Sequence, residues 1–175
     1  MRIKPRKLQA PPPPGFDCEQ RMQNTFLYER AWVDQNERLS TTYVYFVFEV
    51  LAAFGTVCMH AIALGTREKP QTIPYRIVGA LKLLQLGVDA AYQGQGLGLI
   101  VVTDMIELAI KLSARAGCRY VVLDARPELV SWYERQGFVI NKVEQRTREE
   151  AAARRGTSTI PVSMRFDLRA VRGAA

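Results

Sequence analysis

Apolar and polar residues follow two different periods along this chain, which predicts a protein built from both helices and strands. Apolar residues recur every three or four positions between Glu19 and Val33, which predicts a first helix with Asp17 as its N-cap. Two runs rich in β-branched and aromatic residues follow, TTYVYFVFEVL and FGTVCMHAIAL. Such runs are typical of buried strands, and we expect them to be joined near Ala52–Gly55.

The second half of the chain alternates between strand and helix patterns. An apolar stripe with spacings of three and four begins at Leu97 and predicts a helix that ends at Gly117. A charged stretch, EQRTREEAAARRG, is expected to be a mobile hairpin loop or a short helix. The other expected elements are strands over residues 77–88, 119–125, 138–143 and 159–168 and a helix over residues 127–136. The order α-ββ-β-α-β-α-β-β predicts a mixed sheet with helices on its faces.

A glycine-rich turn stands between the strand over 77–88 and the helix that follows it, in the stretch VDAAYQGQGLG. A helix N-terminus offers unpaired N–H groups and a partial positive charge, and glycines let those groups approach an anion closely. The strand, turn and helix together therefore predict a phosphate site. The turn is not a GxGxxG dinucleotide fingerprint, because its glycines read GQGLG and no second helix-strand repeat follows. It is not a Walker site, because GK[ST] is missing.

Two motifs in this order resemble the GNAT superfamily of acyl-CoA-dependent N-acetyltransferases. VDAAYQGQGLG is similar to the family's Q/R-x-x-G-x-G/A pyrophosphate loop, and WYERQGF, residues 132–138, is similar to its later helix-end motif. The resemblance covers roughly residues 16–143. It implies the GNAT fold: an α/β protein with a mixed central β-sheet, a splayed cofactor-binding strand and helices on both faces.

The resemblance also implies which residues bind acetyl-CoA, the expected co-substrate. Backbone groups of the splayed strand would hold the pantetheine arm, and main-chain N–H groups of the turn would hold the pyrophosphate. Tyr133 stands where many members place a tyrosine beside the sulfur of acetyl-CoA. The implied cofactor-binding residues are Leu86, Gly87 and Val88 on the strand and Gln93, Gly94, Gln95, Gly96, Leu97 and Gly98 in the turn.

The implied chemistry is direct attack of a neutral amine on the thioester. The N–H of Val88 is the candidate donor to the developing oxyanion. Tyr133 is the catalytic candidate, because a phenol titrates near ~10, stays protonated at neutral pH and can supply a proton to the departing thiolate. No convincing general base stands out. The acidic candidates are Glu49, Asp89, Asp104 and Glu107, for which a strand edge, a turn cap and a solvated helix face are the simpler explanations. His60 lies in an apolar strand and is more simply a core histidine than a substrate-binding residue.

One position departs from the family pattern. Many members carry Asn or Asp seven residues before the tyrosine, where it caps the helix and touches the cofactor. This chain has Arg126 there, followed by Pro127. This position therefore departs from the family's cap contact and places a cation near the cofactor or the acceptor.

A narrower resemblance concerns the acceptor. GFDCEQRMQNTFLYERAWVDQ followed by TTYVYFV is similar to the opening of GNAT toxins from toxin–antitoxin pairs, which acetylate the α-amine of aminoacyl-tRNA. Glu19 replaces the glycine usual in that opening, and FGTVCMHAIAL replaces an aromatic-rich strand. The resemblance implies aminoacyl-tRNA as acceptor, a cognate antitoxin as partner and a homodimer. The alternatives are acetylation of a small amine or a protein N-terminus, and a non-catalytic acetyl-CoA-binding regulatory module.

Charge is concentrated at the two ends of the chain. Of a formal net charge of +7, residues 1–16 contribute four basic and no acidic residues, and residues 141–175 contribute eight basic and four acidic ones. The functional interpretation is a footprint for a polyanion such as tRNA, and the alternative is a pair of solubilising tails. The phosphate-contact candidates are Arg2, Lys4, Arg6, Lys7, Arg76, Lys82 and Arg126, of which Arg76, Lys82 and Arg126 are also the candidates for acceptor binding.

Domain organisation and compartment complete the expectations. Pro11–Pro14 is a stiff spacer, so we expect a basic proline-rich arm over residues 1–15 and one acetyltransferase domain over residues 16–175. Three widely spaced cysteines and a single histidine predict reduced thiols and no metal site. No secretory signal or membrane span is visible, and the predicted location is the cytoplasm.

Overall fold

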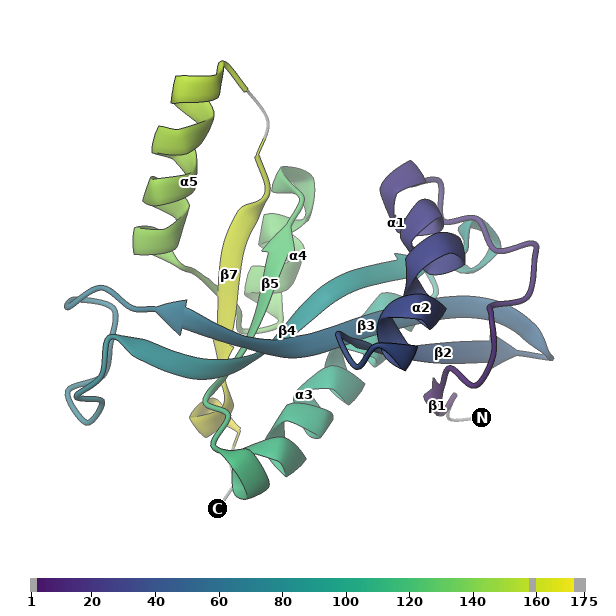
Figure 1. Cartoon of the computed structure of the whole chain (residues 1–175), viewed down its shortest axis with the longest axis horizontal. Coiled ribbons are helices and arrows are strands. Elements are labelled where there is room, and N and C mark those ends of the chain that lie inside the picture. The colour runs from purple at the N-terminus through teal and green to yellow at the C-terminus, as the bar shows by residue number, and fades with distance from the viewer. Residues whose placement is uncertain (1–2, 158–159, 172–175) are drawn as a thin grey trace. The chain divides into compact units, whose positions relative to one another are not determined.

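The computed structural model describes residues 3–157 and 160–171. Two compact units make up the chain: Met1–Cys58 with Leu83–Leu108, and Met59–Lys82 with Ala109–Ala175. Figure 1 shows the elements, which in chain order are β1 (Arg6–Lys7), α1 (Arg21–Thr25), the π-helix η1 (Phe26–Arg30), α2 (Ala31–Asn36), β2 (Thr41–Val47), β3 (Val50–Ala63), β4 (Ile77–Val88), the 3-10 helix η2 (Ala90–Tyr92), α3 (Leu97–Ala116), β5 (Tyr120–Ala125), the 3-10 helix η3 (Pro127–Leu129), α4 (Val130–Arg135), β6 (Val139–Ile140), α5 (Lys142–Arg155), β7 (Val162–Asp167) and the 3-10 helix η4 (Leu168–Ala170).

The strands form one seven-stranded sheet in the order β1-β2-β3-β4-β5-β7-β6. The pairs β1–β2, β2–β3, β5–β7 and β6–β7 are antiparallel. The neighbouring strands β4 and β5 are joined by the crossover helix α3, and a helical crossover between neighbouring strands makes them parallel. The predicted mixed α/β fold is therefore confirmed.

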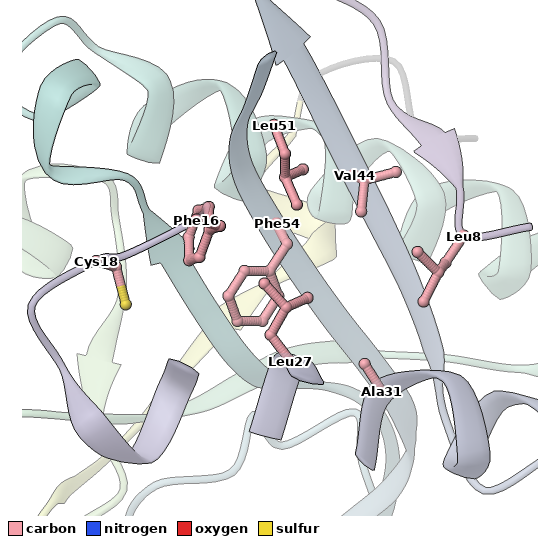
Figure 2. Close-up of a cluster of buried hydrophobic side chains, with 8 residues drawn as sticks. All are labelled: Leu8, Phe16, Cys18, Leu27, Ala31, Val44, Leu51 and Phe54. Atoms are coloured by element: carbon pink, nitrogen blue, oxygen red, sulfur yellow. The ribbon is translucent and has the colours of Figure 1, made fainter. Parts of the chain in front are cut away.

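The first unit is held together by an apolar cluster between its helices and its strands, drawn in Figure 2. Leu27 and Ala31 point from the helices towards Phe54 of β3, and all three side chains are fully buried. The predicted first helix is interrupted by one π-helical segment, η1. Asp17 is not its N-cap, because α1 begins only at Arg21.

The turn between β2 and β3 lies earlier than predicted. It is formed by Phe48 and Glu49, with φ angles of 46° and 65°, and not by Ala52–Gly55, which belongs to β3. Both turn residues adopt the left-handed conformation that glycine and asparagine usually supply. The sequence therefore contains no signal for the turn between β2 and β3, which lies within a mostly apolar run.

In the second unit the charged stretch forms helix α5, so the short-helix alternative is right and the hairpin loop is wrong. Glu68 fixes the start of α5, because its carboxylate accepts hydrogen bonds from the N–H groups of Lys142 (2.8 Å) and Val143 (3.2 Å). Gly156 ends the helix with a φ of 69°. The strands on either side, β6 and β7, are shorter than predicted, and Thr159, the expected start of the last strand, lies outside the described residues.

Part of the expected N-terminal arm belongs to the sheet. Arg6 and Lys7 pair with β2, and Leu8 is 5% exposed within the cluster of Figure 2. The main chain of Leu8 donates to Thr42 and accepts from the side chain of Gln35. The division of the chain at residue 15 stays a prediction. Among the described residues, no helix is both long and apolar enough to span a bilayer.

Candidate active site

The glycine turn begins where β4 ends and is shaped by short-range capping. The carboxylate of Asp89 accepts a hydrogen bond from the N–H of Ala91 (3.0 Å) and so caps the 3-10 helix η2. Asp89 is thus a turn cap, the simpler of the two roles considered for it. Two residues after η2 the chain enters the left-handed region at Gly94 (φ 74°) and again at Gly96 (φ 85°), and α3 begins at Leu97.

The glycines leave room at the N-terminus of α3. A Cβ atom built on Gly94 or on Gly96 would have no described neighbour within 4 Å, so both glycines are required by their φ angles and not by close packing. The first N–H groups of a helix have no acceptor within it, and the helix dipole adds a partial positive charge there. Open space, free N–H donors and positive potential fit the pyrophosphate of a coenzyme A thioester.

The two glutamines of the turn bind main-chain carbonyl groups of the protein. The amide of Gln93 donates to the carbonyl oxygens of Val88 (3.1 Å) and Cys18 (3.3 Å). The amide of Gln95 donates to the carbonyl of Ala91 (3.0 Å). These side chains fix the path of the turn. The sequence alone could not predict these hydrogen bonds, because their acceptors are main-chain carbonyl groups, which every residue has.

The remaining predicted cofactor residues occupy β4 and the first turn of α3. A side chain on Gly87 would collide with Phe54, whose ring lies 2.6 Å from the position of a Cβ atom, so glycine is needed there for packing. Leu86 and Val88 are half-buried on β4. Leu97 is buried and Gly98 half-buried at the start of α3.

Tyr133 lies on α4 in the second unit and is 7% exposed. Its ring packs edge-on against Trp132 and Phe138, with centroid separations of 4.8 Å and 5.6 Å. Burial raises the pKa of the Tyr133 hydroxyl to about 12, against the opposing effect of the Arg126 charge. No other described residue hydrogen-bonds this hydroxyl. It is therefore a protonated donor that its neighbours leave available.

The predicted acceptor-binding cations also lie in the second unit. The ammonium of Lys82 forms an ion pair with Asp124 (2.7 Å), and Arg126 forms a longer one with Glu128 (3.2 Å). Arg76 is exposed immediately before β4. The pairing of Lys82 reduces the charge that it could offer to a phosphate. Arg2, another phosphate candidate, lies outside the described residues.

None of the candidate bases has the surroundings of a poised general base. Asp104 on α3 is half-buried. Burial and, secondarily, the negative charge of Asp104 raise the pKa of Tyr45, so the Asp104 carboxylate lies near the Tyr45 hydroxyl. Glu49 forms the exposed β2–β3 turn, and Glu107 is half-buried on α3. Burial and, secondarily, the Lys82 charge lower the pKa of His60, which is therefore neutral at neutral pH.

Comparison with known families assigns the chain. The sequence pattern of the acetyltransferase (GNAT) family matches residues 18–138, more than half of the 175-residue chain and both motifs described above. The chain belongs to the acetyltransferase (GNAT) family. It is accordingly an acyl-CoA N-acetyltransferase, and its family uses acetyl-CoA.

Individual relatives differ in what they acetylate. A 52-residue stretch is 50% identical to a probable glucosamine 6-phosphate N-acetyltransferase 2 of Oryza sativa subsp. japonica, and it spans 30% of this chain and 29% of that protein. The sequence match thus covers less than a third of this relative, so it does not assign the relative's substrate to this GNAT protein.

Solved structures share the GNAT fold at low sequence identity. A bacterial toxin superposes with a TM-score of 0.77 at 19% identity, over 96% of this chain and 92% of that one. AtaT in complex with acetyl-methionyl-tRNAfMet gives a TM-score of 0.72 at 18% identity, over 89% and 86%. AtaTR bound with acetyl-CoA gives 0.72 at 19%, over 96% and 95%. The expected resemblance to toxin-type GNAT proteins is confirmed at the level of the fold.

Metal coordination is not indicated in the part of the chain that the structure describes. Residues 3–157 and 160–171 contain no group of three or more His, Cys, Asp or Glu side chains that could hold a metal ion. Cys18 and Cys118 are buried and Cys58 is half-buried. The candidate residues of this GNAT protein are the main-chain donors of the glycine turn in the first unit and, separately, the buried phenol of Tyr133 in the second.

Proposed function

We propose that this GNAT protein binds acetyl-CoA at the glycine turn and transfers the acetyl group to the α-amine of aminoacyl-tRNA. The observation that carries the cofactor half is the pair of left-handed glycines, Gly94 and Gly96, with open space in front of the N-terminus of α3. The pyrophosphate would lie on the N–H groups of Gly94 to Gly98, and β4 would hold the pantetheine arm through the main chain of Leu86, Gly87 and Val88.

Acetyl-CoA supplies an activated acyl group on a thiol that leaves as a thiolate. The chain would supply two donors for this reaction: the Val88 N–H, which would stabilise the developing negative charge, and the Tyr133 hydroxyl, which would give its proton to the sulfur. The turn lies in the first unit and Tyr133 in the second, so their joint action is supported by the motif order that the chain shares with its family.

The aminoacyl-tRNA acceptor is supported by chemistry and by fold. An ester draws electrons from the neighbouring α-amine, which is therefore less basic than a lysine and loses its proton near neutral pH without a strong base. Such an acceptor is consistent with the acidic residues and His60 described above, none of which has the surroundings expected of a general base. The fold neighbours include AtaT complexed with acetyl-methionyl-tRNAfMet.

A small amine that carries a phosphate is the second candidate acceptor. The stretch 50% identical to a probable glucosamine 6-phosphate N-acetyltransferase favours it. Amino sugars are weaker bases than lysine, so this acceptor also needs no strong base. Both candidate acceptors, charged tRNA and glucosamine 6-phosphate, carry an amine and at least one phosphate group. They differ in size and in total charge.

The deciding experiment is acetyl transfer from labelled acetyl-CoA to a panel of acceptors. We expect label on charged tRNA and none on deacylated tRNA, which lacks the amine. Label on glucosamine 6-phosphate but not on charged tRNA would replace the first candidate by the second. Label on peptides with a free N-terminus alone would favour a protein acceptor, and acetyl-CoA binding without transfer to any amine would favour a regulatory module.

Partners and compartment follow from the same proposal. A fold neighbour is a mutant AtaT toxin bound to the C-terminus of the antitoxin AtaR, so we propose a cognate antitoxin here. Growth arrest on expression without that partner, relieved by Tyr133→Phe, would support it. A homodimer is proposed from the resemblance and is tested by sedimentation. With acetyl-CoA and charged tRNA as the proposed substrates, the proposed compartment is the cytoplasm.

A further inference from the structure

We propose that residues Phe16–Cys18, called here the N-terminal strap, set the affinity for acetyl-CoA by holding the glycine turn in its binding conformation, with Asn24 as the positioning residue. This inference rests on the proposed function, because it concerns the same turn. All the contacts involved lie within the first unit. The strap and Asn24 lie outside residues 93–98, the turn that is expected to bind the pyrophosphate.

The strap is hydrogen-bonded to the segment that opens the turn. The N–H of Asp17 donates to the carboxylate of Asp89 (2.9 Å), and the N–H of Ala90 donates to the carbonyl of Asp17 (2.8 Å). The carbonyl of Cys18 accepts from the amide of Gln93 (3.3 Å). Three hydrogen bonds therefore connect the strap to residues 89–93, immediately before the left-handed glycines.

Asn24 on α1 holds the strap in place from the other side. Its amide donates to the Asp17 carboxylate (2.6 Å), and its carbonyl accepts from the N–H of Cys18 (3.1 Å). The N–H of Glu19 also donates to the Asp17 carboxylate (2.8 Å), and these two donors lower the pKa of Asp17, so it stays charged at neutral pH. Asn24 thus uses both ends of its amide on the strap and none on the turn itself.

An aromatic contact anchors the strap on the cofactor strand. The buried ring of Phe16 packs edge-on against Phe54, with a centroid separation of 5.5 Å, and both rings cover Gly87 of β4. The hydroxyl of Tyr28 accepts a hydrogen bond from the N–H of Phe16 (2.8 Å). The strap therefore lies against β4 at one end and against the glycine turn at the other.

This arrangement lowers the cost of ordering the turn when the ligand binds. A segment with two left-handed glycines has many accessible conformations, and each conformation that does not bind reduces the apparent affinity. The strap removes some of those conformations before the ligand arrives. The effect of Asn24 should therefore appear mainly in the affinity for acetyl-CoA and less in the rate of the chemical step.

The test compares acetyl-CoA binding by the full-length protein and two variants. Asn24→Leu removes the hydrogen bonds that the side-chain amide makes with Asp17 and with the N–H and thiol of Cys18. Asn24→Asp keeps the acceptor but places a carboxylate against Asp17. We expect the dissociation constant, measured by calorimetry, to rise about 3- to 10-fold, as the removal of one or two hydrogen bonds predicts. The KM for acetyl-CoA should rise with it, by a larger factor than kcat falls.

Two controls separate positioning from a general loss of stability. Gln35→Ala removes the hydrogen bonds to Leu8 (2.5 Å) and Thr42 (3.0 Å) in the same unit, so it should lower the melting temperature and leave the acetyl-CoA affinity unchanged. Thr25→Ala changes an exposed neighbour of Asn24 on the same helix and should change neither quantity.

A second measurement needs no ligand. Amide hydrogen exchange at Ala90, whose N–H is bound by the strap, should be faster in Asn24→Leu than in Gln35→Ala. An unchanged acetyl-CoA affinity in folded Asn24 variants, with unchanged exchange at Ala90, overturns the inference and leaves the proposed function standing. Failure of the unaltered protein to bind acetyl-CoA overturns the proposed function, and the inference with it.

Discussion

Tyr133 is a phenol whose burial keeps it protonated well beyond neutral pH, because its pKa is raised to about 12. We predict that Tyr133→Phe lowers kcat by ~10²–10⁴-fold, the usual effect of losing a general acid, and changes the acetyl-CoA affinity little. Steady-state kinetics with the best acceptor measure both quantities. Equal effects on kcat in Tyr133→Phe and in Trp132→Phe, its neighbour on α4, would reduce Tyr133 to a packing residue.

The same pKa sets the pH behaviour. Below pH 10, the usual pKa of tyrosine, the hydroxyl is protonated in both the folded and the unfolded chain and stability does not depend on it. Between pH 10 and about 12 the unfolded chain loses this proton first, so the free energy of unfolding falls with rising pH over that interval. In the active range the rate should rise with pH as the acceptor amine loses its proton.

Glu19 is an ordinary residue in a glycine conformation, with a φ of 59°. A side chain in the left-handed region costs ~1–2 kcal/mol, while glycine costs ~0.5–1 kcal/mol of unfolded-state entropy. We predict that Glu19→Gly raises the free energy of unfolding by up to ~1 kcal/mol, since it relieves the first cost and adds the second. Denaturant titration measures the change.

Glu19→Ala is the matched control, because it removes the carboxylate but keeps the strained backbone. It should not be more stable than the unaltered chain. Equal stabilisation by both substitutions would mean that charge, and not conformation, disfavours Glu19. The φ angle of Glu19 is one that glycine adopts without strain.

At the scale of elements, the glycine turn can be tested against a similar backbone conformation elsewhere. Gly96 (φ 85°) and Gly156 (φ 69°) are both left-handed, and a Cβ atom on either meets nothing within 4 Å. We predict that Gly96→Glu and Gly156→Glu each cost ~1–2 kcal/mol of stability. Only Gly96→Glu should abolish acetyl-CoA binding, because it places an anion at the phosphate site. Similar acetyl-CoA affinities in the two folded variants would remove the site from this turn.

Glu68 makes helix α5 part of the second unit. Its carboxylate accepts from the start of the helix and pairs with Arg165 (3.1 Å), and both side chains are about nine-tenths buried. Breaking a buried pair costs ~3–5 kcal/mol because a charge is left without its partner. We predict a loss of that size in Glu68→Gln. Glu150→Gln, in the exposed pair with Arg146 on the same helix, should cost under ~1 kcal/mol.

The acid stability of the protein should depend on the same carboxylate. Burial alone would raise the pKa of Glu68, but three main-chain N–H donors and Arg165 outweigh burial and lower it from 4.5. The stabilisation is therefore complete above pH 4.5 and is lost as the pH falls through the lowered value. Glu68→Gln should lack this part of the pH dependence. An unaltered acid-unfolding profile in that variant would contradict the assignment.

Sequence reasoning succeeded where one local pattern decides the structure. The four-residue spacing of Leu97, Val101 and Met105 predicted the buried face of α3, and all three are buried. It failed where a distant residue decides. The start of α5 depends on Glu68, which is 74 positions from Lys142, and the β2–β3 turn depends on residues without turn propensity. The candidate cofactor residues came from the motif, whereas the strap contacts came only from the structure.

At the scale of the whole molecule, the basic N-terminus should act through its charge. Deleting residues 1–14 would also remove buried Leu8, so point substitutions are the cleaner test. If the acceptor is charged tRNA, Lys4→Gln with Lys7→Gln should weaken tRNA binding and reduce the slope of log K against log salt by about 1 for each phosphate that these lysines neutralise. Both lysines are exposed. Binding is measured with acetyl-CoA saturating.

Lys111→Gln with Arg115→Gln is the control for net charge, since these exposed residues lie near the end of α3 and not on the N-terminal segment. Equal slopes of log K against log salt in the two double variants would mean that tRNA binding depends only on the net charge of the protein. Unchanged activity on a small amine in both variants would show that the reacting groups are intact.

Three elements pass from one unit into the other: β3 after Cys58, β4 after Lys82 and α3 after Leu108. During synthesis on a ribosome, neither unit can therefore be finished before the chain has begun the other. Phe16 and Asp17 emerge 71 and 72 residues before their partners Gly87 and Asp89. For that interval a growing chain can pair the strap with Asn24 and Tyr28 but not with β4 or the glycine turn, so the cofactor-binding turn is completed only after more than half of the chain has been synthesised.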